Sequence, residues 1–205
     1  MSTEMRIRTT KRVAREDGGR SAYIKVPEGV KVSREGLKVT VEGPLGKLEK
    51  DFSHMGKLIR IDRVTDDVIR VRGESKRKKI KALVGTLAAH IRNMITGVTQ
   101  GYTYYMRIYY THFPVKIRVD EKEGIVYIEN LYGERYPRMA KILPGVKVKR
   151  DGKEVVTVTG IDKDAVSQTA ANIEQATRLT GKRRKDQRKF LDGVYIRKRE
   201  VGIHE

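Results

Sequence analysis

Apolar and polar residues alternate along most of the segment between residues 21 and 73. A period of two places successive side chains on opposite faces of an extended chain, so this alternation predicts half-buried β-strands. The expected strands lie at residues 23–26, 30–33, 37–41, 47–52, 58–61 and 68–72. The segment Gly43-Pro44-Leu45-Gly46 predicts a turn between two of them.

The hydrophobic period changes after Gly73. Apolar residues are then spaced by three or four positions, at Ile80, Val84, Leu87, Ile91 and Ile95. This spacing places them on one face of a helix. We therefore expect a helix at about residues 75–95, capped by Ser75 and ended by Gly97.

The same order of elements occurs a second time. Three pairs of segments match at a shift of 87 or 88 residues: Val26-Pro27 with Phe113-Pro114, Glu35–Val39 with Glu123–Tyr127, and Val68–Gly73 with Val155–Gly160. A second helix is expected to begin near Asp162, with an inner face of Val166, Ala170, Ile173 and Ala176 or Thr177. The pattern predicts an α+β fold of two tandem homologous domains, each a mostly antiparallel sheet covered by one helix.

These elements divide the chain into four parts. We expect a basic N-terminal extension at residues 1–20, a first α+β repeat at 21–99, a second at 100–193 and a basic C-terminal tail at 194–205. The extension carries six Lys or Arg and has no apolar period, which is typical of an arm that becomes ordered on binding a partner.

The connection between the repeats, Val98–Phe113, is rich in tyrosine. It holds five of the ten in the chain, at positions 102, 104, 105, 109 and 110. Such a segment could offer stacking surfaces to nucleic-acid bases. It could also be a strand that packs the two domains together, with the hydroxyls at its edge. We favour the second interpretation because the segment lies where a joining strand must be.

The charge balance of the chain indicates what kind of partner it binds. The 205 residues include 45 Lys and Arg against 26 Asp and Glu, a formal net charge of +19. That much positive charge repels itself, and a polyanionic partner offsets the repulsion. Nucleic acid is the first candidate, and an anionic membrane surface is the second. No apolar run is long enough to span a bilayer, and no secretory signal pattern is present, so we expect a cytoplasmic protein without a membrane partner.

Motifs for catalysis and cofactor binding are missing. The chain has no cysteine and only four scattered histidines, so no metal site is expected. No phosphate-binding glycine loop, nucleophile elbow or zinc-protease motif occurs. The acidic residues near Glu121 are typical of a charged turn, and His112 of a packed residue at a strand end. We therefore expect no catalytic residue, no cofactor, no small-molecule substrate and no enzymatic activity.

The densest basic segment is Gly181–Arg199, which has nine Lys or Arg in 19 positions. Phe190, Leu191 and Val194 are expected to anchor it on the folded body, and Asp192-Gly193 to form a turn. Fixed cations with an aromatic residue among them suit a phosphate backbone. The candidate RNA-binding residues are Lys182, Arg183, Arg184, Lys185, Arg188, Lys189, Tyr195, Arg197 and Lys198.

Two other basic clusters give secondary candidates. Lys76, Arg77 and Lys78 lie at the start of the first helix, where the helix dipole favours carboxylates instead. A solvated helix face is an equally good interpretation of them. Arg135, Arg138 and Lys141 form another cluster with Lys147, Lys149 and Arg150. No helix-turn-helix, zinc finger or RNP1-like motif occurs, so recognition of RNA by shape and backbone fits better than readout of a DNA groove.

Several segments resemble one known family. Gln175-Ala176-Thr177 and Lys185–Tyr195 look like the C-terminal signature of the large-subunit ribosomal protein six family, in its archaeal and eukaryotic branch (protein nine of the large subunit in eukaryotes). Arg92–Gly101, Met106–Pro114 and Val41–Gly46 are also similar to that family. The resemblance covers roughly residues 22–197. The segment before Tyr23 and the basic loop Leu179–Arg184 are longer than the family pattern.

The resemblance implies two homologous α+β domains and binding of large-subunit rRNA, mainly through the C-terminal domain. It also implies a position near the base of the factor-binding stalk and the sarcin–ricin loop, with neighbouring ribosomal proteins as further partners. The expected function is that of a structural protein of the large ribosomal subunit. One alternative is a general nucleic-acid-compacting, DNA-binding protein, and a second is an RNA-modifying enzyme.

Overall fold

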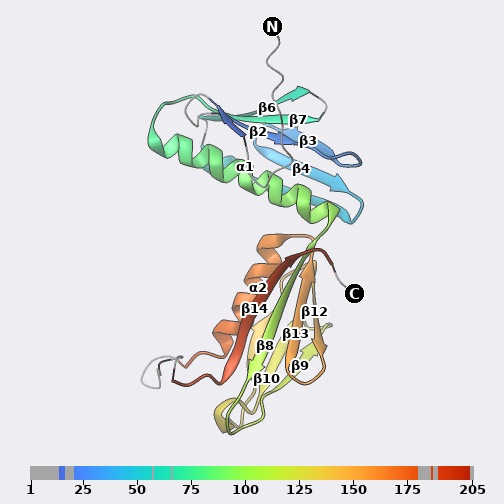
Figure 1. The fold of residues 1–205 in the computed structure, drawn as a ribbon, viewed down its shortest axis with the longest axis vertical. Helices are drawn as coiled ribbons and strands as arrows, with labels where there is room; N and C mark the ends of the chain where they lie inside the picture. The colour runs from blue at the N-terminus through green and yellow to red at the C-terminus, as the bar shows by residue number, and fades with distance from the viewer. Residues whose placement is uncertain are drawn as a thin grey trace. The chain divides into compact units, whose positions relative to one another are not determined.

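The computed structural model describes residues 14–16, 21–56, 58–65, 67–179, 186 and 189–203. They form two compact units (Figure 1). The first unit contains the described residues up to Thr40 together with Glu49–Arg92, and the second contains Val41–Leu48 and the described residues from Asn93 onward.

The N-terminal repeat contains two antiparallel sheets and one helix. Its strands are β1 (Ala14–Glu16), β2 (Ser21–Lys25), β3 (Lys31–Glu35), β4 (Lys38–Gly43), β5 (Gly46–Asp51), β6 (Ile59–Thr65) and β7 (Val68–Gly73), and a 3-10 turn, η2, spans Ser53–Met55. The sheet orders are β1-β2-β7-β6 and β3-β4-β5. The helix α1 (Lys78–Thr99) buries Val84, Leu87 and Ile91, which confirms the predicted inner face. Parts of β4, β5 and α1 (Val41–Leu48 and Asn93–Thr99) belong to the second unit.

The second unit repeats this plan. Its elements are β8 (Tyr102–Tyr109), β9 (Lys116–Asp120), β10 (Ile125–Glu129), the 3-10 turn η3 (Leu131–Gly133), β11 (Arg138–Lys141), β12 (Val146–Asp151), β13 (Val155–Gly160), α2 (Lys163–Ala176) and β14 (Gly193–Val201). Its sheets have the orders β12-β13-β8-β14 and β11-β10-β9.

The two units share one topology. The order β1-β2-β7-β6 in the first matches β14-β8-β13-β12 in the second. Gly36 and Gly124, which the repeat aligned, both adopt a left-handed conformation, at φ 63° and 65°. These equivalences confirm the predicted α+β fold of two tandem homologous domains, each a mostly antiparallel sheet with one covering helix.

The edge position beside the first strand of each repeat is filled from opposite ends of the chain. β1 pairs with β2 in the first unit, and β14 pairs with β8 along its whole length in the second. The charge pattern placed residues 194–205 in a basic tail, but most of them form β14. The alternation is hard to see because a bulge near Arg197 shifts the register.

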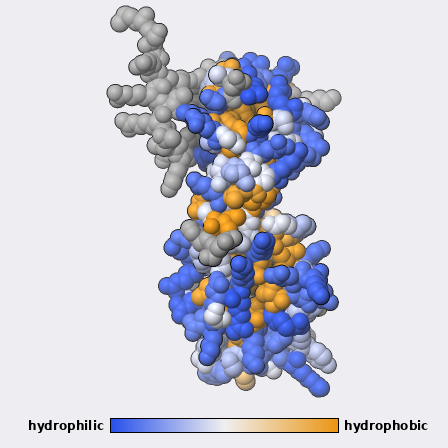
Figure 2. All heavy atoms as spheres, turned by 90° about the vertical axis from the view of Figure 1, so that its right-hand side faces the viewer, coloured by the Kyte–Doolittle hydropathy of each residue, from blue (hydrophilic) through white to orange (hydrophobic). Residues whose placement is uncertain are grey.

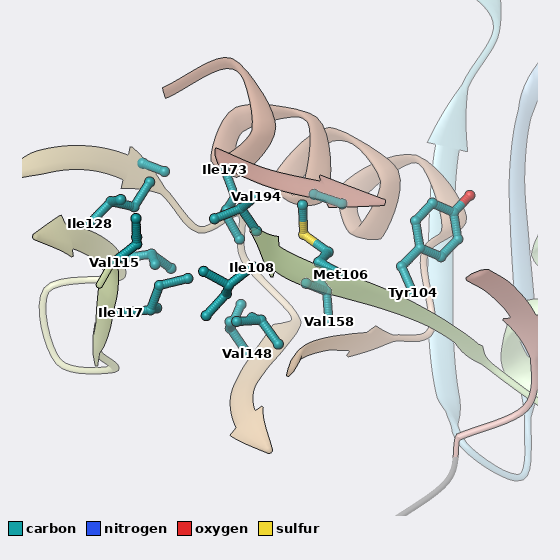
Figure 3. Close-up of a cluster of buried hydrophobic side chains, with 14 of the residues drawn as sticks. Tyr104, Met106, Ile108, Val115, Ile117, Ile128, Val148, Val158, Ile173 and Val194 are labelled. Carbon is teal, nitrogen blue, oxygen red and sulfur yellow. The ribbon is translucent and has the colours of Figure 1, made fainter. Parts of the chain in front are cut away.

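The core of the second unit lies beneath α2 (Figure 3). Met106 and Ile108 from β8 pack with Val158 from β13, Ile173 from α2 and Val194 from β14, and all are at most 2% exposed. Packing of this kind is dense, as in other protein interiors. It makes β8 and β14 a rigid base for the segments that leave them.

The tyrosine-rich segment is an inner strand of the second unit, because β8 lies between β13 and β14. Tyr102 and Tyr104 are 4% and 5% exposed and belong to the core. Tyr105 and Tyr109 alternate with the buried Met106 and are only half-buried. Packing therefore accounts for one face of the strand and leaves the other tyrosines to be explained.

The first helix differs from its predicted limits. It begins at Lys78 and continues through Gly97 to Thr99. Gly97 is not a stop but a point of close approach, since a Cβ added there would lie 2.0 Å from the Ile161 carbonyl oxygen. The chain leaves the helix at Gly101, which has φ 78° and donates its N–H to the Thr96 carbonyl at 3.2 Å. This is the usual glycine termination, four residues later than expected.

Replacing Gly97 with Ala should therefore destabilise the chain by about 1–3 kcal/mol, because a backbone carbonyl must move to make room. Thr86→Ala, on the exposed face of α1, is the matched control and should change stability by less than about 0.5 kcal/mol. Urea unfolding of both variants measures the difference. Equal stabilities would contradict the close approach at Ile161.

Candidate nucleic-acid interface

Most of the predicted basic site lies in a segment that connects α2 to β14. Lys182, Arg183, Arg184, Lys185 and Arg188 lie outside the described residues. Of the remaining predicted residues, Lys189, Arg197 and Lys198 are exposed and Tyr195 is half-buried. The described structure on both sides of the segment shows how its ends are held.

The first end is the C-terminus of α2. Asp162 caps the start of the helix by accepting the Asp164 N–H at 3.0 Å, as predicted, and Val166, Ala170 and Ile173 are buried. Thr177 ends it and is 2% exposed. Its hydroxyl donates to the Glu174 carbonyl at 2.7 Å and accepts the Val194 N–H at 3.4 Å. One side chain thus connects the helix end with the start of β14.

Arg138 holds the same helix end from the side. Its Nε and Nη2 donate to the two carboxylate oxygens of Glu134 at 2.7 and 2.8 Å. Its Nη1 donates to the carbonyls of Ala176 and Arg178 at 2.9 and 2.8 Å. A cation at helix C-terminal carbonyls is favoured by the dipole and satisfies otherwise unpaired acceptors. We call Arg138, Glu134 and the two carbonyls the clamp.

The clamp changes the role of a predicted RNA contact. The hydrogen bond to Glu134 raises the pKa of Arg138 above its usual value. The Arg138 side chain is only 22% exposed, and four of its five N–H groups are engaged within the chain. Arg138 is thus a structural cation, and we leave it out of the proposed contact set.

The second end of the segment is Asp192, which is 9% exposed. Its carboxylate accepts the Thr111 N–H at 3.1 Å, and its carbonyl accepts the Tyr132 hydroxyl at 2.9 Å. Burial raises the pKa of Tyr132, and the nearby charge of Asp192 adds to the increase. The expected turn at Asp192-Gly193 is therefore wrong, because Asp192 is an anchor and Gly193 is the first residue of β14.

The turn that contributes Tyr132 has an unusual backbone. Asn130 and Tyr132 have φ 58° and 53° and are the only non-glycine residues with positive φ in the described part of the chain. Such conformations cost on the order of 1–3 kcal/mol each and persist where the surroundings impose them. Here the Asn130 amide donates to the Pro114 carbonyl at 3.2 Å, and Tyr132 is held by Asp192.

The apolar anchor predicted for the basic stretch is only partly correct. Val194 is fully buried, but Phe190 and Leu191 are 43% and 58% exposed. Polar contacts of Thr177 and Asp192 hold the segment where apolar packing was expected. The two side chains instead lie at the surface beside the anchored end.

Comparison with known proteins follows the same division into repeats. The family model for ribosomal protein L6 matches residues 26–101 and 113–193. Three relatives are each named large ribosomal subunit protein uL6. The one from Ignicoccus hospitalis is 51% identical, covering 88% of this chain and 95% of the relative. Those from Desulfurococcus amylolyticus and Aeropyrum pernix are both 48% identical, covering 84% and 87% of this chain and 91% and 93% of the relatives.

The chain belongs to the ribosomal protein L6 family. The expected resemblance, including its archaeal character, is therefore confirmed. The two matched segments correspond to the two repeats, and the second ends in the anchored region, at residue 193.

The secondary candidates are spread over both units. Lys76, Arg77 and Lys78 are exposed at the start of α1, which has no acidic residue in its first turn. Arg135 and Lys141 are exposed on the second unit. Figure 2 shows one face, on which hydrophilic residues cover most of the surface around smaller apolar patches. These cations stay predictions for RNA contact.

Sequence reasoning missed the polar contacts that hold the ends of the segment. One signal was available, since Glu134 and Arg138 are four residues apart in a cluster otherwise interpreted as RNA contacts. Within the described ranges, no group of three or more His, Cys, Asp or Glu is placed to hold a metal ion. None of the helices described is long and apolar enough to cross a membrane.

Replacing Arg138 with Ala should destabilise the chain by about 1–3 kcal/mol, because Glu134 and two carbonyls lose their donors in a partly buried place. Arg178→Ala is the control, since Arg178 pairs with Glu174 at 3.0 Å on the exposed helix surface. That pair should contribute less than about 1 kcal/mol. Denaturant unfolding compares them, and equal losses would contradict the structural role of Arg138.

Tyr132 should make stability depend on alkaline pH. Its pKa is raised in the fold, so its contribution is complete below the usual tyrosine pKa of about 10 and is lost as pH rises through the folded pKa. The free energy of unfolding should therefore fall less steeply above about pH 10 in Tyr132→Phe than in the wild type. Tyr136→Phe, at a site that is 79% exposed, should follow the wild type. Identical slopes in all three proteins would contradict a perturbed Tyr132.

Proposed function

We propose that this chain is a structural component of the large ribosomal subunit that binds large-subunit rRNA through the basic segment between α2 and β14. The observation that carries the proposal is the anchoring of this segment at both ends, by Arg138 and Asp192. Membership of the ribosomal protein L6 family and the names of the relatives support it. The net charge of +19 supports a polyanionic partner.

The mechanism is attachment of rRNA at fixed positions. The segment from Arg178 to Lys189 contains seven Lys or Arg and one Asp. Because both ends are held, less conformational freedom is lost when the cations meet phosphates than in a free tail. Each phosphate contact releases counterions, so the affinity should fall steeply with salt.

We also propose that the contact lies near the base of the factor-binding stalk and the sarcin–ricin loop, a position that the family resemblance implies. Neighbouring ribosomal proteins are the other proposed partners. In this role the protein has no catalytic step, and it works in the cytoplasm as part of the large subunit.

The direct test replaces Arg183, Arg184, Arg188 and Lys189 with Ala. Affinity for a large-subunit rRNA fragment should fall, and the slope of log affinity against log salt should become shallower by about three. The control replaces four exposed cations elsewhere, Lys25, Lys31, Arg34 and Lys116, with the same loss of charge. The control should keep most of the affinity.

Two results would contradict the proposal. Equal effects of the two quadruple variants would mean that net charge alone, and not the basic segment, attracts the RNA. A clear preference of the wild-type chain for duplex DNA over the rRNA fragment at equal salt would favour the alternative, a general nucleic-acid-compacting protein.

A further inference from the structure

The four-stranded sheet of the second unit has one face that no described strand or helix of that unit covers. Its other face carries Val148, Val158 and Met106, which pack beneath α2 and against β9–β11. In Figure 1, α2 runs alongside β14 on one side of this sheet. Side chains alternate across a strand, so every second residue of β12, β13, β8 and β14 belongs to the uncovered face. We call it the open face.

The strand register places a tyrosine between two lysines on the open face. Tyr105 pairs with Thr157 on one side and with Lys198 on the other, and Thr157 pairs with Lys149. These four residues form one row across the sheet. Neighbouring strands are about 4.8 Å apart, so the backbone of Lys198 lies about 5 Å from that of Tyr105. The backbone of Lys149, two strands away on the opposite side, lies about 10 Å from it.

A second aromatic group lies on the same face. The Tyr109 ring has the Arg107 guanidinium over it at 5.4 Å and the Tyr195 ring at a centroid distance of 6.0 Å. Arg197 Nη1 donates to the Tyr109 hydroxyl at 3.3 Å. Tyrosines ordered by neighbouring cations are suited to stacking with nucleic-acid bases.

The charges of the open face favour an anion. Arg107 pairs with Glu154 at 2.9 Å, and Lys198 pairs with Glu200. Asp151 is hydrogen-bonded to Thr157. Lys147 and Lys149 are both exposed and have no ion-pair partner among the residues that the structure describes. Their charge is thus available to a ligand.

The fold brings three separate sequence features onto this face. They are half of the tyrosine-rich segment, the lysines of β12 and the basic residues of β14. Packing explains Tyr102 and Tyr104, but it does not explain why Tyr105 and Tyr109 are half-exposed on the opposite face, or why Tyr105 lies between lysines. A surface for one ligand accounts for all three features together.

We infer that the open face binds an unpaired RNA segment, with a base stacked on Tyr105 and a flanking phosphate at Lys149. The inference rests on the proposed function only in taking RNA as the ligand, since this surface is distinct from the segment between α2 and β14. A paired A-form helix keeps its bases stacked inside and offers none to Tyr105. An acidic protein segment would satisfy the lysines but would leave the ring unused.

The chain has no tryptophan, so Tyr105→Trp places a single reporter at the centre of the open face. Titration of this full-length variant with a short oligouridine should quench the indole emission, because a base stacks on the ring. A blunt RNA duplex of equal charge should quench it much less. Equal quenching by the duplex would overturn the inference.

Affinity measurements give a second test. Tyr105→Ala should bind oligouridine about tenfold more weakly than the wild type, and Lys149→Gln should reduce the salt dependence by about one contact. Tyr136→Ala and Lys122→Gln, both at exposed positions away from the open face, should bind as the wild type does. Wild-type affinity in Tyr105→Ala, or full competition by polyglutamate, would overturn the inference.

The two hypotheses fail separately. Variants of the open face keep the basic segment and its anchors, so they should keep affinity for the large-subunit rRNA fragment at low salt. If the wild-type chain binds oligouridine through Tyr105 but does not bind that fragment, the proposed function is wrong and the open face stands. If the fragment binds and Tyr105→Trp is not quenched by oligouridine, only the open face is wrong.

Discussion

The paired hydrogen bonds between Arg138 and Glu134 are the interaction on which the basic segment depends. They fix a guanidinium where α2 ends, and that guanidinium holds two backbone carbonyls of the departing chain. Charge-assisted, bidentate contacts of this kind are short and directional. The opposite end is held by Asp192, through the Thr111 N–H and the Tyr132 hydroxyl. A dense run of cations is thus attached to a rigid core at both ends.

Duplication explains why only the second unit carries such a segment. Both units use the same sheet order, and both leave an edge position beside the first strand of the repeat. After α1 the chain turns at Gly101 directly into β8, and the edge position is taken by β1. After α2 the chain has to return to the edge of its own sheet as β14. The connection that this return requires carries the basic residues.

Local features of this fold could be predicted from the sequence, whereas contacts between residues distant in sequence could not. Period-two alternation and the repeat predicted most strands of the first repeat and the two domains, because burial of one face imposes them locally, but β1 and β14 were assigned to basic ends of the chain. The end of α1 was predicted too early because Gly97 does not end the helix. It is a glycine because the Ile161 carbonyl, distant in sequence, packs against it. Arg138 was predicted to contact RNA because of its charge, although it forms an ion pair with the Glu134 carboxylate within the chain. Sign and spacing of charges predict a partner, but only the fold decides which cations are free to meet it.

The most direct measurement of the central claim is the rRNA affinity of Glu134→Gln. This change removes the partner of Arg138 while keeping every cation, and it raises the net charge by one. If electrostatic attraction alone governed binding, the variant would bind large-subunit rRNA as tightly as the wild type or more tightly. Anchoring predicts the opposite, a loss of affinity of several-fold at equal salt, because more conformational freedom is then lost on binding. Unchanged or tighter binding would contradict the account.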